Sequence, residues 1–236
     1  MDFNLRDKNV IITGASGQIG SHLVEEFRQR GSNVIDIDVN NCNVSNSDEV
    51  QDFFNRQFSE YKCIDVLINN AGISTFDNFT DRKDEDFNSV LSVNLNGTFN
   101  CIKSYVNNFD KTNQSKGSII NVGSVYGSVS SDPRIYTDCS RVSPEVYGAT
   151  KAGIIQMTKY FAVHLADRRI RVNCISPGGV YNGQGDDFVK NYSDRCPMNR
   201  MAHVDDLHGA FLFFASNMSS YITGQNLLVD GGFTSW

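Results

Sequence analysis

Hydrophobic positions along the chain follow two alternating patterns, short continuous runs and longer stretches in which they recur at the helical period. The short runs predict strands at residues 9–13, 33–37, 65–69, 118–122, 170–175 and 226–229. The periodic stretches predict helices at residues 18–30, 45–61, 84–109 and 204–215, and a further helix after Pro144. Strands that alternate with helices form a parallel sheet. The pattern therefore predicts an α/β fold with a doubly wound parallel sheet of six to seven strands.

The alternation continues to the end of the 236-residue chain, and no linker, internal repeat or low-complexity tract interrupts it. Because α/β proteins of this length commonly form single units, we expect one domain over residues 1–236. The segment between Asp38 and Asn43 is too short for the helix that usually follows a second strand. We therefore expect a shortened crossover there and a stunted third strand.

Composition and charge exclude several classes of function. The net charge is -6 and no basic tract is present, so nucleic acid is not expected as a partner. The N-terminus has no hydrophobic signal core, and no hydrophobic run approaches the roughly 18 residues that span a bilayer, so we expect a cytoplasmic protein without membrane contact. The six cysteines and four histidines are scattered without metal-ligand spacing, so buried free thiols and no metal are expected.

Three glycines, Gly14, Gly17 and Gly20, lie in the segment TGASGQIG, where the first predicted strand meets the first helix. Glycines at such a turn let backbone N–H groups and the helix N-terminus approach a pyrophosphate. Asp38 ends the second strand, where a carboxylate accepts hydrogen bonds from ribose hydroxyls. Asp38 would repel a 2′-phosphate and no arginine follows it, so the pattern favours NAD over NADP. A solvated aspartate without function is the alternative.

Tyr147 and Lys151 lie four residues apart after Pro144, a residue suited to the first turn of a helix. The spacing places both side chains on one helix face. An ammonium group beside a phenol favours the deprotonated form, and such a tyrosine exchanges protons with an alcohol or carbonyl near neutral pH. The same spacing is also common on ordinary amphipathic helices.

The order of several segments is typical of one enzyme family. They are TGASGQIG, NNAG at 69–72, VNLNG with Asn94, NVGS ending at Ser124, YGATK, SPGGV at 176–180 and GQNLLVDGG. In these segments the chain resembles the short-chain dehydrogenase/reductase family over essentially its whole length. The resemblance implies a Rossmann-type fold and hydride transfer between nicotinamide C4 and a carbinol or carbonyl carbon.

The resemblance implies roles for four residues. Tyr147 would be the general acid/base, and Lys151 would promote its ionisation and hold the nicotinamide ribose. Ser124 would hydrogen-bond the substrate oxygen. Asn94, whose side chain competes with backbone bonding inside a helix, would anchor a water that links Lys151 to solvent.

The resemblance also implies a set of cofactor contacts. The expected residues are Gly14, Ser16, Gln18, Ile19, Asp38, Asn43, Val44, Asn70, Ala71, Gly72, Tyr147, Lys151, Pro177, Gly178, Val180 and Asn182. Three of them depart from the family's pattern. Gln18 stands where compact members carry glycine, Asn43 where aspartate is usual, and Asn182 where threonine is common. Because asparagine both donates and accepts hydrogen bonds, we still expect a bound cofactor.

The 23-residue separation of Ser124 and Tyr147 is longer than in most compact members of the family. A loop between two catalytic residues is expected over the substrate side of the cleft. Arg134, Tyr136 and Arg141 in this insertion are therefore candidates to bind a polar or anionic substrate. The alternative is a solvated surface loop whose charges face water.

Within the family, the insertion and an ISPGG turn resemble oxidoreductases of flagellin modification and legionaminic-acid biosynthesis. This likeness implies an NAD-dependent conversion between a secondary alcohol and a ketone on a sugar, amino sugar or sugar phosphate. A generic carbonyl or 3-oxoacyl-thioester reductase and a non-catalytic dinucleotide-binding regulator stay open as alternatives. Family members pair through the helices of Asn94 and Tyr147, so a homodimer or homotetramer is expected, with exposed Phe99, Tyr160 and Phe161 at the contact.

Overall fold

The computed structural model describes residues 3–137 and 142–236, which form a six-stranded parallel sheet between two layers of helices. The strands are β1 (Asn9–Thr13), β2 (Asn33–Ile37), β3 (Val66–Asn69), β4 (Gly117–Val122), β5 (Ile170–Pro177) and β6 (Asn226–Val229). Their order across the sheet is β2-β1-β3-β4-β5-β6. The chain direction across the sheet reverses at β1, and ligands of doubly wound sheets bind at such a switch point. The predicted doubly wound α/β fold is confirmed.

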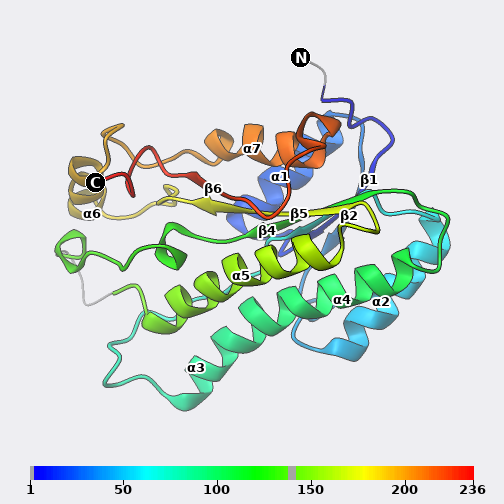
Figure 1. Cartoon of the computed structure of the whole chain (residues 1–236). Coiled ribbons are helices and arrows are strands. Elements are labelled where there is room, and N and C mark those ends of the chain that lie inside the picture. The colour runs from blue at the N-terminus through cyan, green and yellow to red at the C-terminus, as the bar shows by residue number, and fades with distance from the viewer. Residues whose placement is uncertain (1–2, 138–141) are drawn as a thin grey trace.

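Helices cover both faces of this sheet (Figure 1). They are α1 (Gln18–Gln29), α2 (Ser47–Tyr61), α3 (Asp84–Leu91), α4 (Gly97–Phe109), α5 (Glu145–His164), α6 (Asp186–Arg195) and α7 (His208–Ala215). Figure 1 shows α1 and α7 on one face and α2, α4 and α5 on the other. Every residue of β1, β3 and β4 is buried, since helices pack on both sides of these strands. Continuous hydrophobic runs therefore mark the central strands.

The connection after β2 is short and leads to α2 without an intervening strand. The chain turns back at Asn41, whose amide donates to the Asp36 carbonyl, and enters α2 directly. Asn46 caps α2 by accepting hydrogen bonds from the Asp48 and Glu49 N–H groups. The expected short crossover is confirmed, but within residues 3–137 and 142–236 no stunted strand follows it. Hence β2 is the edge of the sheet, because the residues between Asp38 and α2 form turns, with the Asn41 and Cys42 N–H groups donating to the Asp38 carbonyl.

The insertion between Ser124 and Tyr147 packs on α6, a helix that the sequence pattern did not predict. Ile135 is buried with Phe188, Tyr192 and Phe233 in a third hydrophobic cluster. The ring of Tyr192 stacks on that of Phe233 at 4.8 Å between centroids. The insertion is therefore anchored to α6 and the C-terminal segment by hydrophobic contacts, and it is not a purely solvated loop.

The described residues include neither a membrane-spanning helix nor a metal site, and several of their cysteines are buried. In this part of the chain, no helix is long and apolar enough to cross a membrane, and no cluster of metal-ligating side chains is present. Cys42 and Cys174 are buried free thiols, and burial raises the pKa of each to about 11. Cys139 lies outside the described residues.

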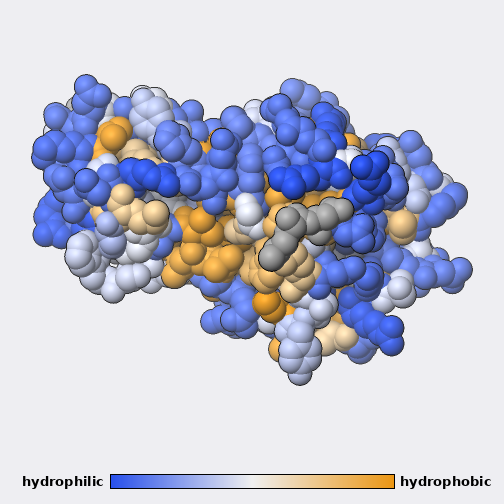
Figure 2. Space-filling view, turned by 90° about the horizontal axis from the view of Figure 1, so that it is seen from above, coloured by the Kyte–Doolittle hydropathy of each residue, from blue (hydrophilic) through white to orange (hydrophobic). Residues whose placement is uncertain are grey.

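Hydrophobic side chains gather on part of the surface. In Figure 2 the face seen from above is mostly hydrophilic, with a hydrophobic region near its middle. On the opposite layer, Phe99 of α4 and Tyr160 and Val163 of α5 are exposed, and the Phe99 ring lies 6.3 Å from that of Phe161. Exposed hydrophobic regions of this kind are typical of contacts between subunits.

Candidate active site

A cleft of about 510 Å³ lies beyond the carboxyl ends of β1, β2 and β3. Twelve of the sixteen expected cofactor residues line it. They are Gly14, Ser16, Gln18, Ile19, Asp38, Asn43, Val44, Asn70, Ala71, Gly72, Tyr147 and Lys151. The tertiary fold thus brings the glycine turn, the end of β2 and the helix of Tyr147 to one cavity at the switch point of the sheet.

The glycine turn leaves no space for side chains at two positions. Gly14 has φ +63°, and a Cβ there would lie 2.8 Å from the Ala71 Cα. A Cβ on Gly20 would lie 2.0 Å from the Gly14 carbonyl oxygen. The backbone therefore approaches the cleft closely at the start of α1, whose N-terminus is suited to a pyrophosphate.

Thr13 and Asn70 join the glycine turn to the end of β3. The Asn70 amide donates to the carbonyls of Thr13 and Gly14 at 2.9 and 3.0 Å. The Thr13 hydroxyl accepts from the N–H groups of Asn70 and Ala71. Asn70 therefore holds the shape of the cleft with its side chain. The sequence analysis did not single out Thr13, although it is the first residue of TGASGQIG.

Asp38 lies at the end of β2 with its carboxylate held in place. One oxygen accepts from the hydroxyl and the N–H of Ser16, at 2.5 and 3.1 Å, and the other from the Val39 N–H. The hydrogen bond from the Ser16 hydroxyl lowers the pKa of Asp38, against the effect of burial. A carboxylate accepts about four hydrogen bonds, so Asp38 retains capacity for a ribose hydroxyl.

Asn43 and Val44 line the cleft beyond Asp38. The Asn43 side-chain oxygen accepts from the N–H and hydroxyl of Ser45, so it stabilises the turn before α2. Val44 is buried, and one of its γ-carbons would lie only 2.7 Å from a Cβ atom added at Gly97. The glycine at the start of α4 therefore lets Val44 form the wall of the cleft.

Four expected cofactor residues, Pro177, Gly178, Val180 and Asn182, do not line this cleft. Pro177 is the last residue of β5, and the other three follow it. Gly178 and Tyr192 meet so closely that a Cβ on Gly178 would lie 2.8 Å from the tyrosine oxygen. This segment is nevertheless joined to the glycine turn, because the Gln18 amide donates to the Tyr181 carbonyl at 2.5 Å. The unusual Gln18 thus connects the two sides of the site.

Tyr147 and Lys151 both line the cleft from α5, as their spacing predicts. The Lys151 ammonium is buried, lies 5.5 Å from the centre of the Tyr147 ring and donates to the Val122 carbonyl at 2.8 Å. Val122 ends β4, and Ser124 follows it at the same edge of the sheet. The Ser124 hydroxyl accepts from the Tyr126 N–H at 3.2 Å and remains a donor.

The long predicted helix over 84–109 contains a π-helical turn at Ser92–Asn96 between α3 and α4. Asn94 is fully buried in this turn, and its side chain binds both backbone groups of Ile73 at 2.8 and 3.0 Å. Its amide also donates to the Thr150 hydroxyl at 3.2 Å, and that hydroxyl donates to the Tyr147 carbonyl at 2.8 Å. Inserted π turns are frequent at functional sites. Thr150 is a residue that the sequence analysis missed.

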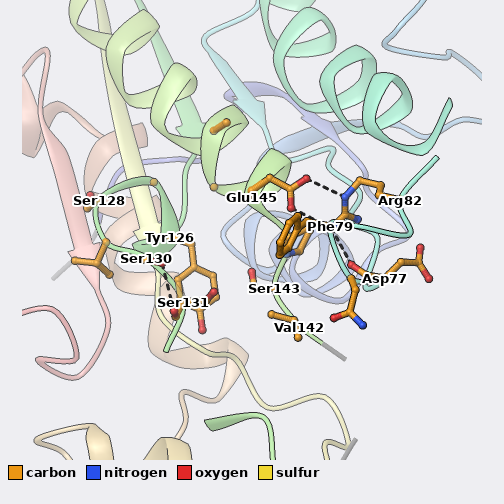
Figure 3. Close-up of a pocket in the computed structure, with 16 residues that line it drawn as sticks. Asp77, Phe79, Arg82, Tyr126, Ser128, Ser130, Ser131, Val142, Ser143 and Glu145 are labelled. Atoms are coloured by element: carbon orange, nitrogen blue, oxygen red, sulfur yellow. Dashed lines mark hydrogen bonds and ion pairs between the residues drawn. The ribbon is translucent and has the colours of Figure 1, made fainter. Parts of the chain in front are cut away.

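A second, polar pocket of about 490 Å³ adjoins the first turn of α5 (Figure 3). Figure 3 shows Arg82 directed at Glu145, and the Arg82 guanidinium donates to both carboxylate oxygens at 2.9 and 3.1 Å. Arg82 also donates to the Thr75 hydroxyl and the Asp77 carbonyl. This buried arginine therefore joins the segment after β3 to the helix of Tyr147. Serines form much of the remaining wall: Ser128, Ser130, Ser131 and Ser143.

Arg134 and Tyr136, two of the three insertion residues expected to contact the substrate, differ in their distance from the pocket and in their exposure. Arg134 points to solvent, with 84% of its side chain exposed, and is ion-paired with Asp132 at 2.7 Å. It lines neither the cleft nor the serine-rich pocket. The Tyr136 hydroxyl lies 3.1 Å from that of Tyr126, which does line the pocket. Arg141 lies outside the described residues. The structure therefore brings Tyr136 close to the site, and it does not bring Arg134 there.

Comparison with known proteins agrees with this geometry. A family model described as enoyl-(acyl carrier protein) reductase matches residues 2–234. A 3-oxoacyl-(acyl-carrier-protein) reductase of Thermotoga maritima is 34% identical over 97% of this chain and 98% of its own length. The chain belongs to the short-chain dehydrogenase/reductase family. It is therefore an oxidoreductase of the Rossmann-fold type.

Two solved structures, one of a short-chain dehydrogenase and one of a sugar dehydrogenase, share this fold closely. A short-chain dehydrogenase from Leptospira borgpetersenii with bound NAD+ is 44% identical, with a TM-score of 0.91 over 97% of this chain and 93% of that one. The aldohexose dehydrogenase of Thermoplasma acidophilum is 27% identical, with a TM-score of 0.87 over 100% of this chain and 97% of that one. A nicotinamide dinucleotide is thus the cofactor class that the family relationship supports.

Proposed function

We propose that this protein is an NAD-dependent oxidoreductase that converts a secondary alcohol to a ketone, or the reverse, with Tyr147 as general acid/base. The observation that carries the proposal is the position of the buried Lys151 ammonium, 5.5 Å from the Tyr147 ring and in the same cleft as the glycine turn. Tyr147 and Lys151 thus border the cavity in which a cofactor and a substrate would meet. The family relationship supports the reaction type.

The residues of the cleft fit a nicotinamide dinucleotide. Gly14 and Gly20 leave backbone room for a pyrophosphate at the start of α1, and the Asp38 carboxylate is held where a ribose would bind. Lys151 uses one of its three N–H bonds on Val122, so two remain for Tyr147 and the nicotinamide ribose. The bound dinucleotide would supply the hydride acceptor or donor.

In this mechanism the protein handles the proton and orients the substrate. During oxidation the deprotonated Tyr147 oxygen takes the proton of the alcohol, and during reduction the protonated Tyr147 hydroxyl donates a proton to the oxygen of the ketone. The Ser124 hydroxyl, at the end of β4, donates to the substrate oxygen. Asn94 binds the Ile73 backbone and, through Thr150, the helix turn that carries Tyr147. It therefore fixes the position of Tyr147 relative to the segment after β3. A water bound near Asn94 would carry the proton to solvent.

We propose NAD over NADP because of the charge at the ribose end. Of the described residues that line the cleft, Lys151 is the only cation, and it lies at the Tyr147 end. Arg28 lines a separate hollow beside Asp38, but its guanidinium is paired with Asp36 at 2.9 Å. A 2′-phosphate would therefore face the Asp38 carboxylate without a free cation to offset it.

For the substrate, we propose a polar, hydroxylated molecule such as a sugar, amino sugar or sugar phosphate. The serine-rich pocket beside α5 and the similarity to an aldohexose dehydrogenase support this class. The second candidate is a 3-oxoacyl thioester, which the 34% identity to a 3-oxoacyl-(acyl-carrier-protein) reductase favours. Surface-glycan biosynthesis is the pathway that we propose for the first class.

One assay separates these candidates. NADH formation from NAD is measured across hexoses, amino sugars and sugar phosphates, and NADH consumption with 3-oxoacyl thioesters. Turnover with the sugars alone supports the first proposal, and turnover with the thioesters alone replaces it by the second. If no compound is turned over while NADH still binds, a non-catalytic dinucleotide-binding role is favoured. We also propose a homodimer or homotetramer through the α4 and α5 faces, which light scattering on a size-exclusion column measures.

A further inference from the structure

A cavity of about 660 Å³, separate from both the cofactor cleft and the serine-rich pocket, lies at the amino ends of the strands. This is the opposite end of the sheet from the cofactor cleft. Gly117 and Ile170, the first residues of β4 and β5, form part of the cavity, and Tyr221 lies beyond α7 on its rim. It shares no lining residue with the cofactor cleft. Cavities of this size hold small organic ligands.

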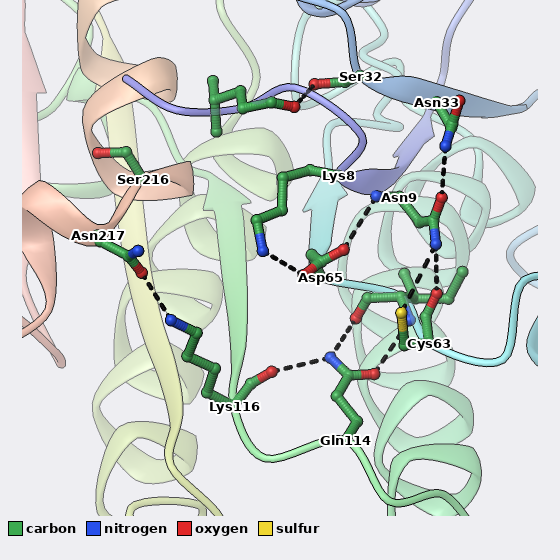
Figure 4. A network of polar contacts seen from close by, with 12 residues as sticks. Lys8, Asn9, Ser32, Asn33, Cys63, Asp65, Gln114, Lys116, Ser216 and Asn217 are labelled. Atoms are coloured by element: carbon green, nitrogen blue, oxygen red, sulfur yellow. Dashed lines mark hydrogen bonds and ion pairs between the residues drawn. The ribbon is translucent and has the colours of Figure 1, made fainter. Parts of the chain in front are cut away.

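The charge of this cavity differs from that of the whole protein. Among the described residues that line it there are four cations and one carboxylate: Lys8, Lys116, Arg169, Arg171 and Asp65. The chain as a whole carries a net charge of -6. Figure 4 shows Lys8 paired with Asp65, at 2.7 Å, and Lys116 directed at Asn217 instead. Three cations are therefore left without a carboxylate in this cavity.

Neutral oxygens hold two of these three cations in place. The Lys116 ammonium donates to the Asn217 side-chain oxygen at 3.0 Å. The Arg171 guanidinium donates to the carbonyls of Phe214 and Ser216 at the end of α7. Burial lowers the pKa of Arg171, as expected for a guanidinium that is partly removed from water. These contacts fix the positions of the cations without neutralising them.

Arg169 carries the third cation on a strained backbone. Its φ is +55°, in the left-handed region where glycine and asparagine are favoured and arginine is not. Within the described residues its guanidinium makes no hydrogen bond or ion pair. The turn between α5 and β5 holds Arg169 in this conformation, since its N–H donates to the Ala166 carbonyl and its carbonyl accepts from the Gly117 N–H. Its side chain is exposed at the edge of the cavity and is available to a ligand.

The remaining wall of the cavity is partly hydrophobic. Ile170 is buried at its base, Ile222 is half-buried, and the Tyr221 ring is fully exposed at its rim. A flat exposed ring offers a face on which an aromatic ligand stacks. The cavity therefore combines cations for an oxyanion with surfaces for a ring.

We propose that this cavity binds a small aromatic phosphate, either an aryl phosphate or a nucleoside monophosphate. Lys116 and Arg169 hold the phosphate, and the ring packs on Tyr221 and Ile222. Guanidinium and ammonium groups make short, charge-assisted hydrogen bonds to phosphate oxygens. The proposal does not depend on the function of the cofactor cleft.

The test is calorimetric titration of the full chain with phenyl phosphate and with AMP, in the presence of saturating NADH so that the cofactor cleft is filled. We expect saturable binding that weakens as ionic strength rises. Phenol and adenosine, which lack the charge, are expected to bind weakly. Tighter binding of AMP than of phenyl phosphate assigns the nucleoside class, and equal affinities assign the aryl phosphate class.

Matched variants test the assignment of residues. Arg169→Asn is expected to weaken phosphate binding about tenfold, the effect of one charge-assisted hydrogen bond, while the melting temperature stays equal or rises. Lys116→Gln is expected to act similarly. Arg168→Asn is the control, because Arg168 is the neighbouring cation, pairs with Asp110 and does not line the cavity. Equal affinities of the Arg169 and Arg168 variants, or no saturable binding in the presence of NADH, overturns the proposal.

Discussion

The amide nitrogen of Asn94 lies 3.2 Å from the hydroxyl oxygen of Thr150, and that hydroxyl donates to the carbonyl of Tyr147. Both residues are fully buried, so water does not replace these bonds if one partner is lost. The π turn at Ser92–Asn96 is thereby fixed to the turn of α5 that carries Tyr147. Thr150 is a positioning residue in this arrangement, since it acts through its neighbours.

Thr150→Val keeps the shape of the side chain but removes the hydroxyl, which leaves the Asn94 amide with one fewer acceptor. We expect the free energy of unfolding to fall by about 1–3 kcal/mol and kcat to fall more than KM rises. Thr150→Ser, which keeps the hydroxyl, is expected to restore most of both. Urea unfolding and steady-state kinetics measure the two effects. An unchanged kcat in Thr150→Val would contradict the positioning role.

Tyr147→Phe removes the proposed proton donor and acceptor without a large change in volume. We expect NADH binding to be retained and turnover to fall by about 10²–10⁴-fold, the usual contribution of general acid–base catalysis. Fluorescence titration with NADH and steady-state kinetics check the two expectations. Tyr160→Phe is the matched control, because Tyr160 lies on the same helix and is exposed. Near wild-type turnover in Tyr147→Phe would show that another group handles the proton.

Lys151→Met removes the buried ammonium that lies between Val122 and Tyr147. We expect both NADH affinity and turnover to decrease, because we propose that the same cation serves the nicotinamide ribose and the tyrosine. The comparison with Tyr147→Phe is informative, since that variant is expected to lose turnover alone. If Lys151→Met kept its NADH affinity, the ribose contact would have to be assigned elsewhere. Circular dichroism establishes that both variants are folded.

Asp38→Asn tests the choice of cofactor. The charged carboxylate is expected to repel a 2′-phosphate and to bind the ribose of NAD, so its loss should shift the ratio of NAD to NADP affinity by about tenfold toward NADP. Isothermal titration with each dinucleotide measures this ratio. Asp36→Asn, which removes the exposed carboxylate paired with Arg28, is the control. A wild-type preference for NADP would refute the argument from Asp38.

Asp206 makes stability depend on acid pH. Hydrogen bonds from Arg200 lower its pKa to about 2 in the folded state, against about 3.9 in an unfolded chain. Its contribution is therefore complete above about pH 4 and is lost as the pH falls towards 2. We expect Asp206→Asn to lower the urea midpoint at pH 7 and to have little effect near pH 2. A difference that stayed constant over this range would exclude the ion pair as its cause.

Local patterns predicted much of the fold and of the site. The six strands, the helix of Tyr147 and Lys151 and the glycine turn were all predicted from spacing, because each depends on residues close in sequence. The sharing of one cleft by Gly14, Asp38 and Tyr147 followed from the family resemblance. The prediction of a stunted third strand was wrong, because the chain between β2 and α2 forms hydrogen-bonded turns instead of a strand.

The sequence by itself determined the order of the six strands and of the helices other than α6, the likeness to a family and the candidate residues for its chemistry. The tertiary structure decided which of these side chains meet. It turned Arg134 to solvent, packed the insertion on α6, placed Thr150 between Asn94 and Tyr147, and gathered Lys116 and Arg169 in a cavity far from the cofactor cleft. The physical reason is that such contacts join residues distant in sequence, whose meeting depends on the packing of whole helices against the sheet.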